Sequence, residues 1–264
     1  MIAATFNVNS VNARIENLSR WLKEKSPDIV LLQEIKTESA NFPFFELQAL
    51  GYEAAVLGQK SYNGVAVLSK KKIKVIEEGL PGIKDEQARY LEVETEAGGI
   101  FWRVASVYLP NGNPPYNQPD DDSKYRYKLA WMEALFQHAK ALFALNRPVI
   151  LGGDFNVILT ADDVYDEKAF LNDALYREEV KQKLTALKYL GYYDAFRLLH
   201  PQENGYTFWD YSGQALQADN GMRIDYMMLS APAADRLEKC YVDKTPRQGT
   251  KPSDHTPLMI ELKE

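Results

Sequence analysis

Residues 148–156 read PVILGGDFN, four residues with an apolar core followed by two glycines, an aspartate, a phenylalanine and an asparagine. The run 148–151, bounded by glycine, predicts a short buried strand. Asp154 and Asn156 then lie just beyond its end, where a rigid backbone often positions functional side chains. Taken alone, the Asp-x-Asn pattern more often makes a turn, because both side chains bond nearby backbone N–H groups. The rest of the sequence is needed to distinguish a turn from a functional site.

Further short apolar segments rich in β-branched residues predict additional strands. They are residues 2–8, 28–32, 64–68, 101–109, 224–229 and 256–262. Apolar residues at helical spacing predict helices within 11–22, 129–145 and 175–190. Helices fall between strands, which indicates an α/β or α+β fold and leaves the strand order open. Residues 110–122, rich in proline, glycine and aspartate, predict a long surface loop.

The composition is that of one ordinary globular domain, residues 1–264, with 45% hydrophobic and 26% charged residues. Cys240 is the single cysteine, so no intrachain disulfide is possible. With an N-terminus that begins as a strand, this favours a cytoplasmic protein. No apolar run is long enough to span a bilayer, so we expect no membrane partner.

The net charge of −6 argues mildly against an obligate nucleic-acid binder, because phosphate contacts need lysine and arginine. Basic residues do cluster at 70–74 and 124–128. For each cluster alone, a solvated turn or helix face is the better interpretation.

Polar residues recur at the ends of other predicted strands. Oxygen ligands for a hard divalent cation are available from Glu34, Asp154 and Asp254 and from the amides of Asn7, Asn9 and Asn156. A histidine, His255, could contact a phosphoryl group, and a carboxylate, Asp225, could orient that histidine. Each signal is weak alone, but their joint occurrence favours a metal-assisted phosphoryl site.

Six motifs occur in the order found in the exonuclease III family. They are FNVN (6–9), LQE (32–34), YLPNG (108–112), GGDFN (152–156), RIDY (223–226) and KPSDH (251–255). The chain thus resembles that family, part of the endonuclease/exonuclease/phosphatase superfamily, over residues 5–262. The resemblance implies a four-layer α/β sandwich, two mixed β-sheets packed face to face with helices outside. It also implies a site where the strand-end loops of both sheets converge.

The resemblance implies a magnesium site, in which Mn²⁺ can substitute for Mg²⁺. Glu34 would be the principal ligand, with Asp154, Asn7 and Asn9 close to the metal. Asp254 would lie near the metal or would contact one of the residues that bind it. Asn9 stands where some family members carry an acid. Whether one or two ions bind stays open.

The resemblance also implies catalytic roles. Asp154 would orient or deprotonate the attacking water, helped by Asn156. His255, held by Asp225, would contact the scissile phosphate, and Tyr108 would stabilise the phosphate or the leaving oxygen. Whether His255 acts as an acid or only as a positive charge stays open.

By the same resemblance the chain is a monomeric base-excision-repair enzyme with abasic-site (AP) endonuclease and 3′–5′ exodeoxyribonuclease or 3′-end-trimming activity. Its partner would be double-stranded DNA with abasic sites or blocked 3′ ends. Phe208, Met222 and Ile224 would line a small apolar pocket for the base-free sugar, beside Trp209, and Arg223 would reach DNA phosphate. From the residues alone, Phe208 and Trp209 fit a core aromatic pair almost as well. Residues 158–168 have no assigned role.

Two other functions compete. A phosphoinositide or sphingomyelin phosphoesterase would share the scaffold, but the sequence has no basic amphipathic helix with exposed aromatics and no lipid anchor. A catalytically inactive DNA-binding module would have lost Glu34, Asp154 or His255, and all three are present.

Overall fold

The computed structural model describes residues 1–212 and 214–263, which form two six-stranded mixed sheets. The first sheet contains β1 (Ile2–Asn7), β2 (Ile29–Gln33), β3 (Glu53–Leu57), β4 (Val65–Ser69), β11 (Leu237–Val242) and β12 (Leu258–Leu262). Its strand order is β11-β12-β1-β2-β4-β3.

The second sheet has the order β5-β6-β7-β8-β10-β9. Its strands are β5 (Ile73–Glu78), β6 (Tyr90–Ala97), β7 (Ile100–Tyr108), β8 (Val149–Asp154), β9 (Tyr192–Asp194) and β10 (Asp225–Ser230).

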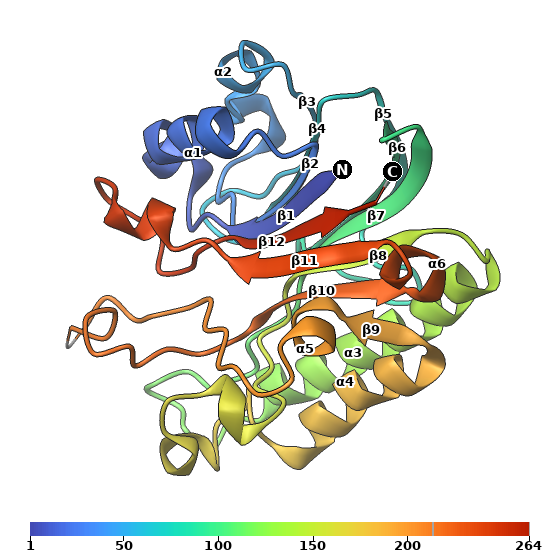
Figure 1. Ribbon diagram of the computed structural model, residues 1–264. Helices are drawn as coiled ribbons and strands as arrows, with labels where there is room; N and C mark the ends of the chain where they lie inside the picture. The colour runs from blue at the N-terminus through green and yellow to red at the C-terminus, as the bar shows by residue number, and fades with distance from the viewer. Residues whose placement is uncertain (213, 264) are drawn as a thin grey trace.

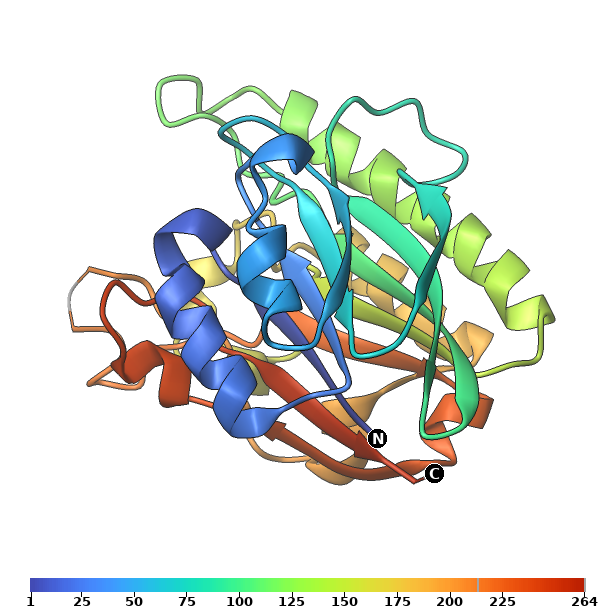
Figure 2. The same cartoon turned by 90° about the horizontal axis from the view of Figure 1, so that it is seen from above.

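Helices cover the outer face of each sheet, as Figures 1 and 2 show. The first sheet is covered by α1 (Val11–Lys25) and α2 (Phe44–Gln48), and the second by α3 (Ser123–Ala144) and α4 (Glu178–Leu190). The shorter helices are α5 (Ala195–Leu199), α6 (Ala231–Ala234), η1 (Ser39–Asn41), η2 (Ala161–Asp163), η3 (Glu167–Phe170) and η4 (Thr245–Gln248). The four-layer α/β sandwich expected from the sequence is therefore confirmed.

Three apolar cores hold the layers together. The core between the sheets includes Leu31, Val67, Trp102 and Ile150, all fully buried. Because strand side chains alternate between the two faces of a sheet, the next residues along each strand pack against the helices instead. This is why the predicted strands read as continuous apolar runs rather than as alternating ones.

Gly152 and Gly153 allow β8 to pack closely against its surroundings. A Cβ atom on Gly153 would lie 1.8 Å from the carbonyl oxygen of Val107 on the neighbouring strand. A Cβ atom on Gly152 would lie 2.6 Å from side-chain atoms of both Leu31 and Met227. The two glycines before Asp154 are therefore required by packing.

The strand directions bring several chain segments to one end of the sandwich. β1 runs parallel to β2, and β7 runs parallel to β8, so their carboxyl ends meet there. β10 runs antiparallel to β8, and its first residue, Asp225, lies opposite the last residue of β8, Asp154. In the parallel ladder of β7 with β8, Tyr108 pairs with Asp154. Polar residues from distant parts of the chain are thus gathered at this end.

All seven strands and three helices predicted from the sequence are present, but β3, β5, β6, β9 and β11 were not predicted. β6 was missed because its glutamates alternate with apolar residues and dilute the hydrophobic signal. The 110–122 loop is confirmed as irregular. Lys70, Lys71 and Lys72 lie in the exposed connection between β4 and β5, and Lys74 is an exposed residue of β5. One lysine of the second basic cluster, Lys128, is buried, so the interpretation of that whole cluster as a solvated face is wrong. Within the described residues, no helix is both long and apolar enough to cross a membrane.

Candidate active site

Three polar residues at the strand ends have left-handed backbone conformations. Glu34 has φ 49°, Asn156 has φ 48° and Asn9 has φ 45°. Such values are uncommon for residues other than glycine, and they cluster where surrounding structure enforces a functional geometry. The backbone N–H of Ser10 donates to the Glu34 carbonyl at 2.7 Å, which ties the loops after β1 and β2 together. The turns aim these side chains across the end of the sandwich.

Asn7 joins the two sheets at the centre of the site. Its Nδ2 atom donates to Glu34 Oε1 at 2.8 Å and to Asp154 Oδ2 at 2.9 Å. Its Oδ1 atom accepts a hydrogen bond from the backbone N–H of Asn9 at 3.1 Å. In this arrangement Asn7 sets the spacing of two carboxylates, whereas the sequence had placed its amide among the metal-binding oxygens.

Lys36 is a site residue that the sequence reasoning missed. Its Nζ atom lies 2.8 Å from Glu34 Oε2 and donates to Asn9 Oδ1 at 2.7 Å. Burial by itself raises the pKa of Glu34, but the Lys36 charge and the hydrogen bond from Asn7 outweigh it and lower that pKa. In the sequence, the position of Lys36 two residues after Glu34 was the signal that could have identified it.

His255 is held between two aspartates. Its Nδ1 atom lies 2.8 Å from Asp225 Oδ2, and its Nε2 atom lies 3.7 Å from Asp154 Oδ2. Burial by itself lowers the pKa of His255, but the Asp225 and Asp154 carboxylates outweigh it and raise that pKa to about 10. The ring therefore carries a proton on both nitrogens at neutral pH, and Asp225 orients it as the sequence predicted.

The carboxylates at this end exceed the positive charge beside them. Burial, with the charges of Asp225 and Glu34, raises the pKa of Asp154 to about 7, although the charge of His255 opposes the rise. The Oδ1 atom of Asp225 is buried and has no hydrogen-bond partner. Strongly perturbed carboxylates of this kind are typical of functional sites.

One carboxylate oxygen each from Glu34 and Asp154 and one ring nitrogen of His255 lie within 4.8 Å of one another, close enough to share a metal ion. A doubly protonated imidazole has no free lone pair, so the two carboxylates are the candidate ligands. Oxygen donors of this type suit Mg²⁺ and Mn²⁺. The side chains present thus fit a hard divalent cation.

Asp254 and Asn9 do not belong to that three-residue group. Asn9 Nδ2 donates to Asp254 Oδ1 at 2.9 Å, and Ser253 also donates to Asp254. The amide oxygen of Asn9 is already bonded to Lys36. The structure therefore places Asn9 and Asp254 in a hydrogen-bond network beside the two candidate ligands.

Tyr108 and Asn156 flank Asp154 on the second sheet. Burial and the charges of Glu34 and Asp154 raise the pKa of Tyr108, so its phenol stays protonated and can donate. The backbone N–H of Asn156 donates to Asp154 Oδ1 at 3.0 Å, and its Nδ2 atom donates to the Leu109 carbonyl at 3.0 Å. Both residues therefore lie beside Asp154, at the end of the sheet where the sequence predicted a site.

A cavity of about 450 Å³ adjoins His255 through Phe208, which lines it. Phe208 packs edge-on against His255, with ring centroids 5.0 Å apart, and together with Met222 it lines this cavity as predicted. The opposite wall includes Tyr165, Phe170 and Leu175. Residues 158–168, which the sequence left unassigned, therefore supply part of the pocket wall, a tertiary contact that no local pattern signals.

Three pocket predictions need correction. Trp209 is fully buried and donates to Asp219 at 3.1 Å, so it belongs to a small core. Ile224 is buried in the cluster beneath the cavity and is not among the cavity-lining residues. Arg223 is fully buried and paired with Asp163 and Asp194, so it cannot reach DNA. In each case tertiary packing, invisible in the sequence, covers the side chain.

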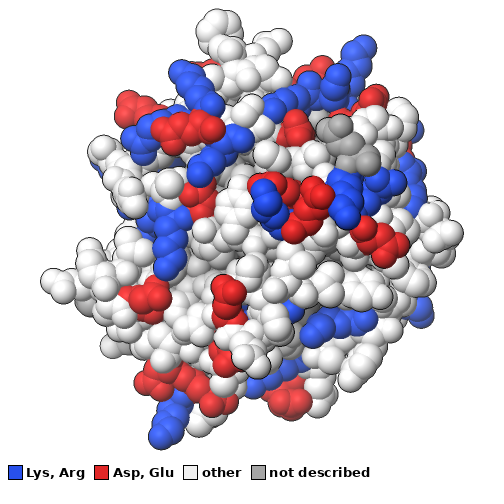
Figure 3. All heavy atoms as spheres, in the orientation of Figure 1, with Lys and Arg blue, Asp and Glu red and all other residues white. Residues whose placement is uncertain are grey.

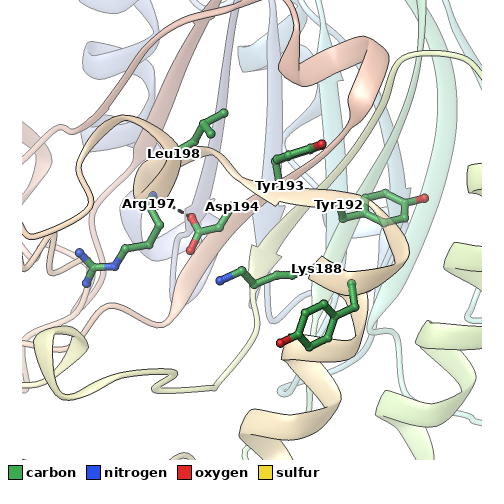
Figure 4. Close-up of a pocket in the computed structure, with 7 residues that line it drawn as sticks. Lys188, Tyr192, Tyr193, Asp194, Arg197 and Leu198 are labelled. Atoms are coloured by element: carbon green, nitrogen blue, oxygen red, sulfur yellow. Dashed lines mark hydrogen bonds between the residues drawn. The ribbon is translucent and has the colours of Figure 1, made fainter.

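A second cavity of about 370 Å³ lies beside α4 and β9 (Figure 4). Tyr189, Tyr192, Tyr193 and Lys188 line it together with Asp194. Asp194 is occupied by Arg223 and by the backbone N–H groups of α5. Glu34, Asp154, Asp225 and His255 line neither cavity. The first cavity adjoins these residues through Phe208, which packs against His255.

The surface charge is mixed rather than of one sign. On the face drawn in Figure 3, lysine and arginine side chains alternate with aspartate and glutamate. This agrees with the net charge of −6. Beside the two candidate ligands, Lys36 supplies a local positive charge.

Two mixed sheets packed face to face, with a carboxylate–imidazolium group where strand ends of both sheets meet, define the class of two-sheet, metal-dependent phosphoesterases. The chain matches the Endonuclease/Exonuclease/phosphatase family over residues 4–255, and it belongs to that family. Within it the chain is a DNA-repair phosphodiesterase of the exonuclease III group.

Three relatives illustrate this similarity. Exodeoxyribonuclease III of Haemophilus influenzae is 30% identical over 98% of each chain. The structure of an AP endonuclease from Archaeoglobus fulgidus is 33% identical over 99% of each chain, with a TM-score of 0.90. A 3′ phosphatase from Neisseria, solved bound to a product DNA hairpin, is 32% identical over all of both chains, with a TM-score of 0.91.

Proposed function

We propose that this enzyme uses Mg²⁺ to incise duplex DNA at abasic sites and to trim blocked 3′ ends. The observation that carries the proposal is the protonated His255 held by Asp225 beside Glu34 and Asp154, next to a cavity lined by Phe208. A negatively charged phosphodiester needs positive charge and positioned donors, and an extruded sugar needs an apolar recess. Relatives named for three different activities support this range of reactions.

The metal bound by Glu34 and Asp154 would supply positive charge against the scissile phosphate. Asp154 is held by the backbone N–H of Asn156 and would orient the attacking water or accept its proton. The backbone and side chain of Asn156 hold the adjoining loop in place. These two residues would fix the line of attack.

His255 and Tyr108 would face the phosphate from the other side. Because the pKa of His255 is raised to about 10, the ring keeps its proton and we infer that it acts as a fixed positive donor. Tyr108 also stays protonated and would donate to the phosphate or to the leaving 3′-oxygen. Both groups stabilise charge that grows in the transition state.

Selectivity would come from the cavity. Extruding a nucleotide costs a few kcal/mol, and it costs least where the base is already missing. Phe208 and Met222 would contact the extruded sugar, while Phe208 also buttresses His255. Recognition and catalysis would then share one aromatic side chain.

We also infer that the chain works as a single domain and a monomer in the cytoplasm. Its one cysteine, Cys240, is buried, so no disulfide is needed to hold the fold. Light scattering during size-exclusion chromatography tests the monomer, and a mass of two chains would contradict it.

The decisive experiment uses duplex DNA with one abasic site, with and without Mg²⁺. An intact duplex and a duplex ending in a 3′-phosphate are run in parallel, with Glu34→Gln as the inactive control. We expect a Mg²⁺-dependent nick at the abasic site, release of the 3′-phosphate and little cutting of the intact duplex. Inertness on both damaged duplexes would overturn the proposal.

A further inference from the structure

A lysine lies in the interior beside the site. Lys128 is in the second turn of α3, and its exposed fraction is 0%. Lysine is rarely buried completely unless its nitrogen has specific partners. The residues assigned to hydrolysis leave Lys128 without a role.

The side-chain nitrogen of Lys128 binds three backbone carbonyls. It donates to Asn156 at 2.6 Å, to Asn111 at 2.9 Å and to Ala174 at 3.0 Å. A protonated lysine has three donors, so each donor has one acceptor. Burial lowers the pKa of Lys128 to about 7, and the charges of Asp173 and Asp154 oppose that change.

The three carbonyls belong to three separate segments. Asn111 is in the loop after β7, Asn156 is in the turn after β8, and Ala174 is in the segment before α4. Irregular segments lack a ladder that pairs their carbonyls, so they need donors from elsewhere. The stem of Lys128 also packs tightly here, because a Cβ atom on Gly112 would lie 2.6 Å from Lys128 Cδ.

Two of these segments are also joined by their side chains. Asn111 Nδ2 donates to Asn156 Oδ1 at 3.3 Å. Asn156 in turn donates from its backbone N–H to Asp154 and from its side chain to Leu109. Lys128 therefore holds the backbone of the residue that orients Asp154.

We propose that Lys128 is a positioning residue for hydrolysis, which acts through Asn156 and keeps the Asn111 and Asn156 segments in register beside Asp154. The inference rests on the proposed role of Asn156 in the site. A methionine has nearly the same length but no donors, so it would leave three buried carbonyls unpaired. The segments would then shift relative to Asp154.

A double-mutant cycle of Lys128→Met with Asn156→Ala tests the proposal on whichever DNA the wild type cuts. We expect Lys128→Met to lower kcat by about 10- to 100-fold, the range for partners that orient a reacting group, with a smaller change in KM. In the Asn156→Ala background the same change should cost much less, because the two residues serve one function. Lys128→Gln, which keeps two donors, should lose less than Lys128→Met.

The matched control is Leu142→Ala, a buried position on the same helix and remote from the strand ends. It should lower the melting temperature but not kcat of the folded enzyme. A full multiplicative loss in the double mutant would overturn the proposal. So would a loss of kcat in Lys128→Met no greater than that in Leu142→Ala.

Hydrogen–deuterium exchange gives a readout that does not depend on activity. We expect faster exchange in segments 109–113, 154–158 and 173–175 of Lys128→Met, and unchanged exchange there in Leu142→Ala. Unchanged exchange in Lys128→Met would overturn the positioning role even if the wild type cut none of the DNA substrates. Failure of the proposed function and failure of this inference are thus separated.

Discussion

Two buried clusters of charged side chains differ in their balance of positive and negative charge. The site cluster consists of Glu34, Asp154, Asp225 and His255, and the arginine cluster consists of Asp163, Asp194, Arg197 and Arg223. The site cluster sets three carboxylates against the imidazolium of His255 and the ammonium of Lys36, which pairs with Glu34. The arginine cluster sets two carboxylates against two guanidinium groups.

The balance of charge in each cluster determines whether the pKa of a buried carboxylate is raised or lowered. Burial by itself raises the pKa of Asp163, but the charges of Arg223 and Arg197 outweigh it and lower that pKa. Burial raises the pKa of Asp154, and neighbouring carboxylates add to the rise. Burial of charge therefore does not by itself mark a site. An excess of one sign does, because it calls for a ligand of the other sign.

Removal of divalent cations should have the largest effect on the site cluster. We expect EDTA to abolish phosphodiester cleavage and Mg²⁺ or Mn²⁺ to restore it, because Glu34 and Asp154 offer oxygen ligands. Mg²⁺ should also raise the melting temperature, since a ligand that binds only the folded state stabilises it. Activity that persists in EDTA, or that zinc alone restores, would contradict the assignment.

Substitutions in the site cluster should separate catalysis from stability. Asp154→Asn and His255→Ala should each lower kcat by about 10²- to 10⁴-fold with little change in fold, because they act mainly in the transition state. The double mutant should lose much less than the product of the two losses. Single-turnover kinetics measures this. Near-normal turnover in either single mutant would refute its role.

Substitution in the arginine cluster should lower stability and leave catalysis nearly unchanged. Asp194→Ala leaves Arg223 Nη1 without an acceptor, leaves Asp163 to balance both arginines and removes the cap of α5. It should therefore lower the free energy of unfolding by about 3–5 kcal/mol. The kcat of the folded protein should stay near the wild-type value. Urea denaturation and kinetics on the same sample test this, and a large loss of kcat without loss of stability would erase the contrast between the clusters.

The pH dependence of stability should report His255. Its pKa rises from 6.5 to about 10 on folding, so the folded state binds the extra proton in that interval. The resulting stability, on the order of a few kcal/mol, is complete below pH 6.5 and is lost as pH rises through about 10. Urea denaturation of the metal-free protein across this range measures the slope. His255→Ala should lack it, whereas Asp194→Ala should keep it because arginine stays charged.

The smallest effect should come from the pocket. Phe208→Ala should reduce the preference for abasic over intact nucleotides by about tenfold, because an apolar recess discriminates by shape. The abasic-to-intact ratio of kcat/KM measures this, with melting recorded alongside. A variant that melts early but keeps the ratio would show that Phe208 serves packing alone.

The central strands and the polar residues at their ends could be predicted from the sequence. Runs such as 148–151 are buried on both faces and therefore continuously apolar, and the polar residues Asp154 and His255 lie close to the ends of such runs. The exposed edge strands have no continuous apolar run by which they could be predicted. β5, for example, mixes apolar and charged residues.

Contacts between distant segments could not be predicted in the same way. Arg223 and Lys128 are basic residues in basic or mixed segments, and both looked exposed. Each is buried because partners from elsewhere in the chain, Asp163 or the Ala174 carbonyl among them, satisfy it. The position of a charged residue in the sequence does not show which partner it will contact in the folded protein.

The glycine pair before Asp154 has a consequence for mutational screens. A saturation screen scored by DNA cleavage would rank Gly153 with Asp154 as intolerant, although a Cβ atom on Gly153 meets only the Val107 backbone. Scoring protein abundance as well as cleavage separates the two positions. Alanine at Gly153 would deplete the protein itself, whereas Asp154→Asn would accumulate normally and cut far more slowly.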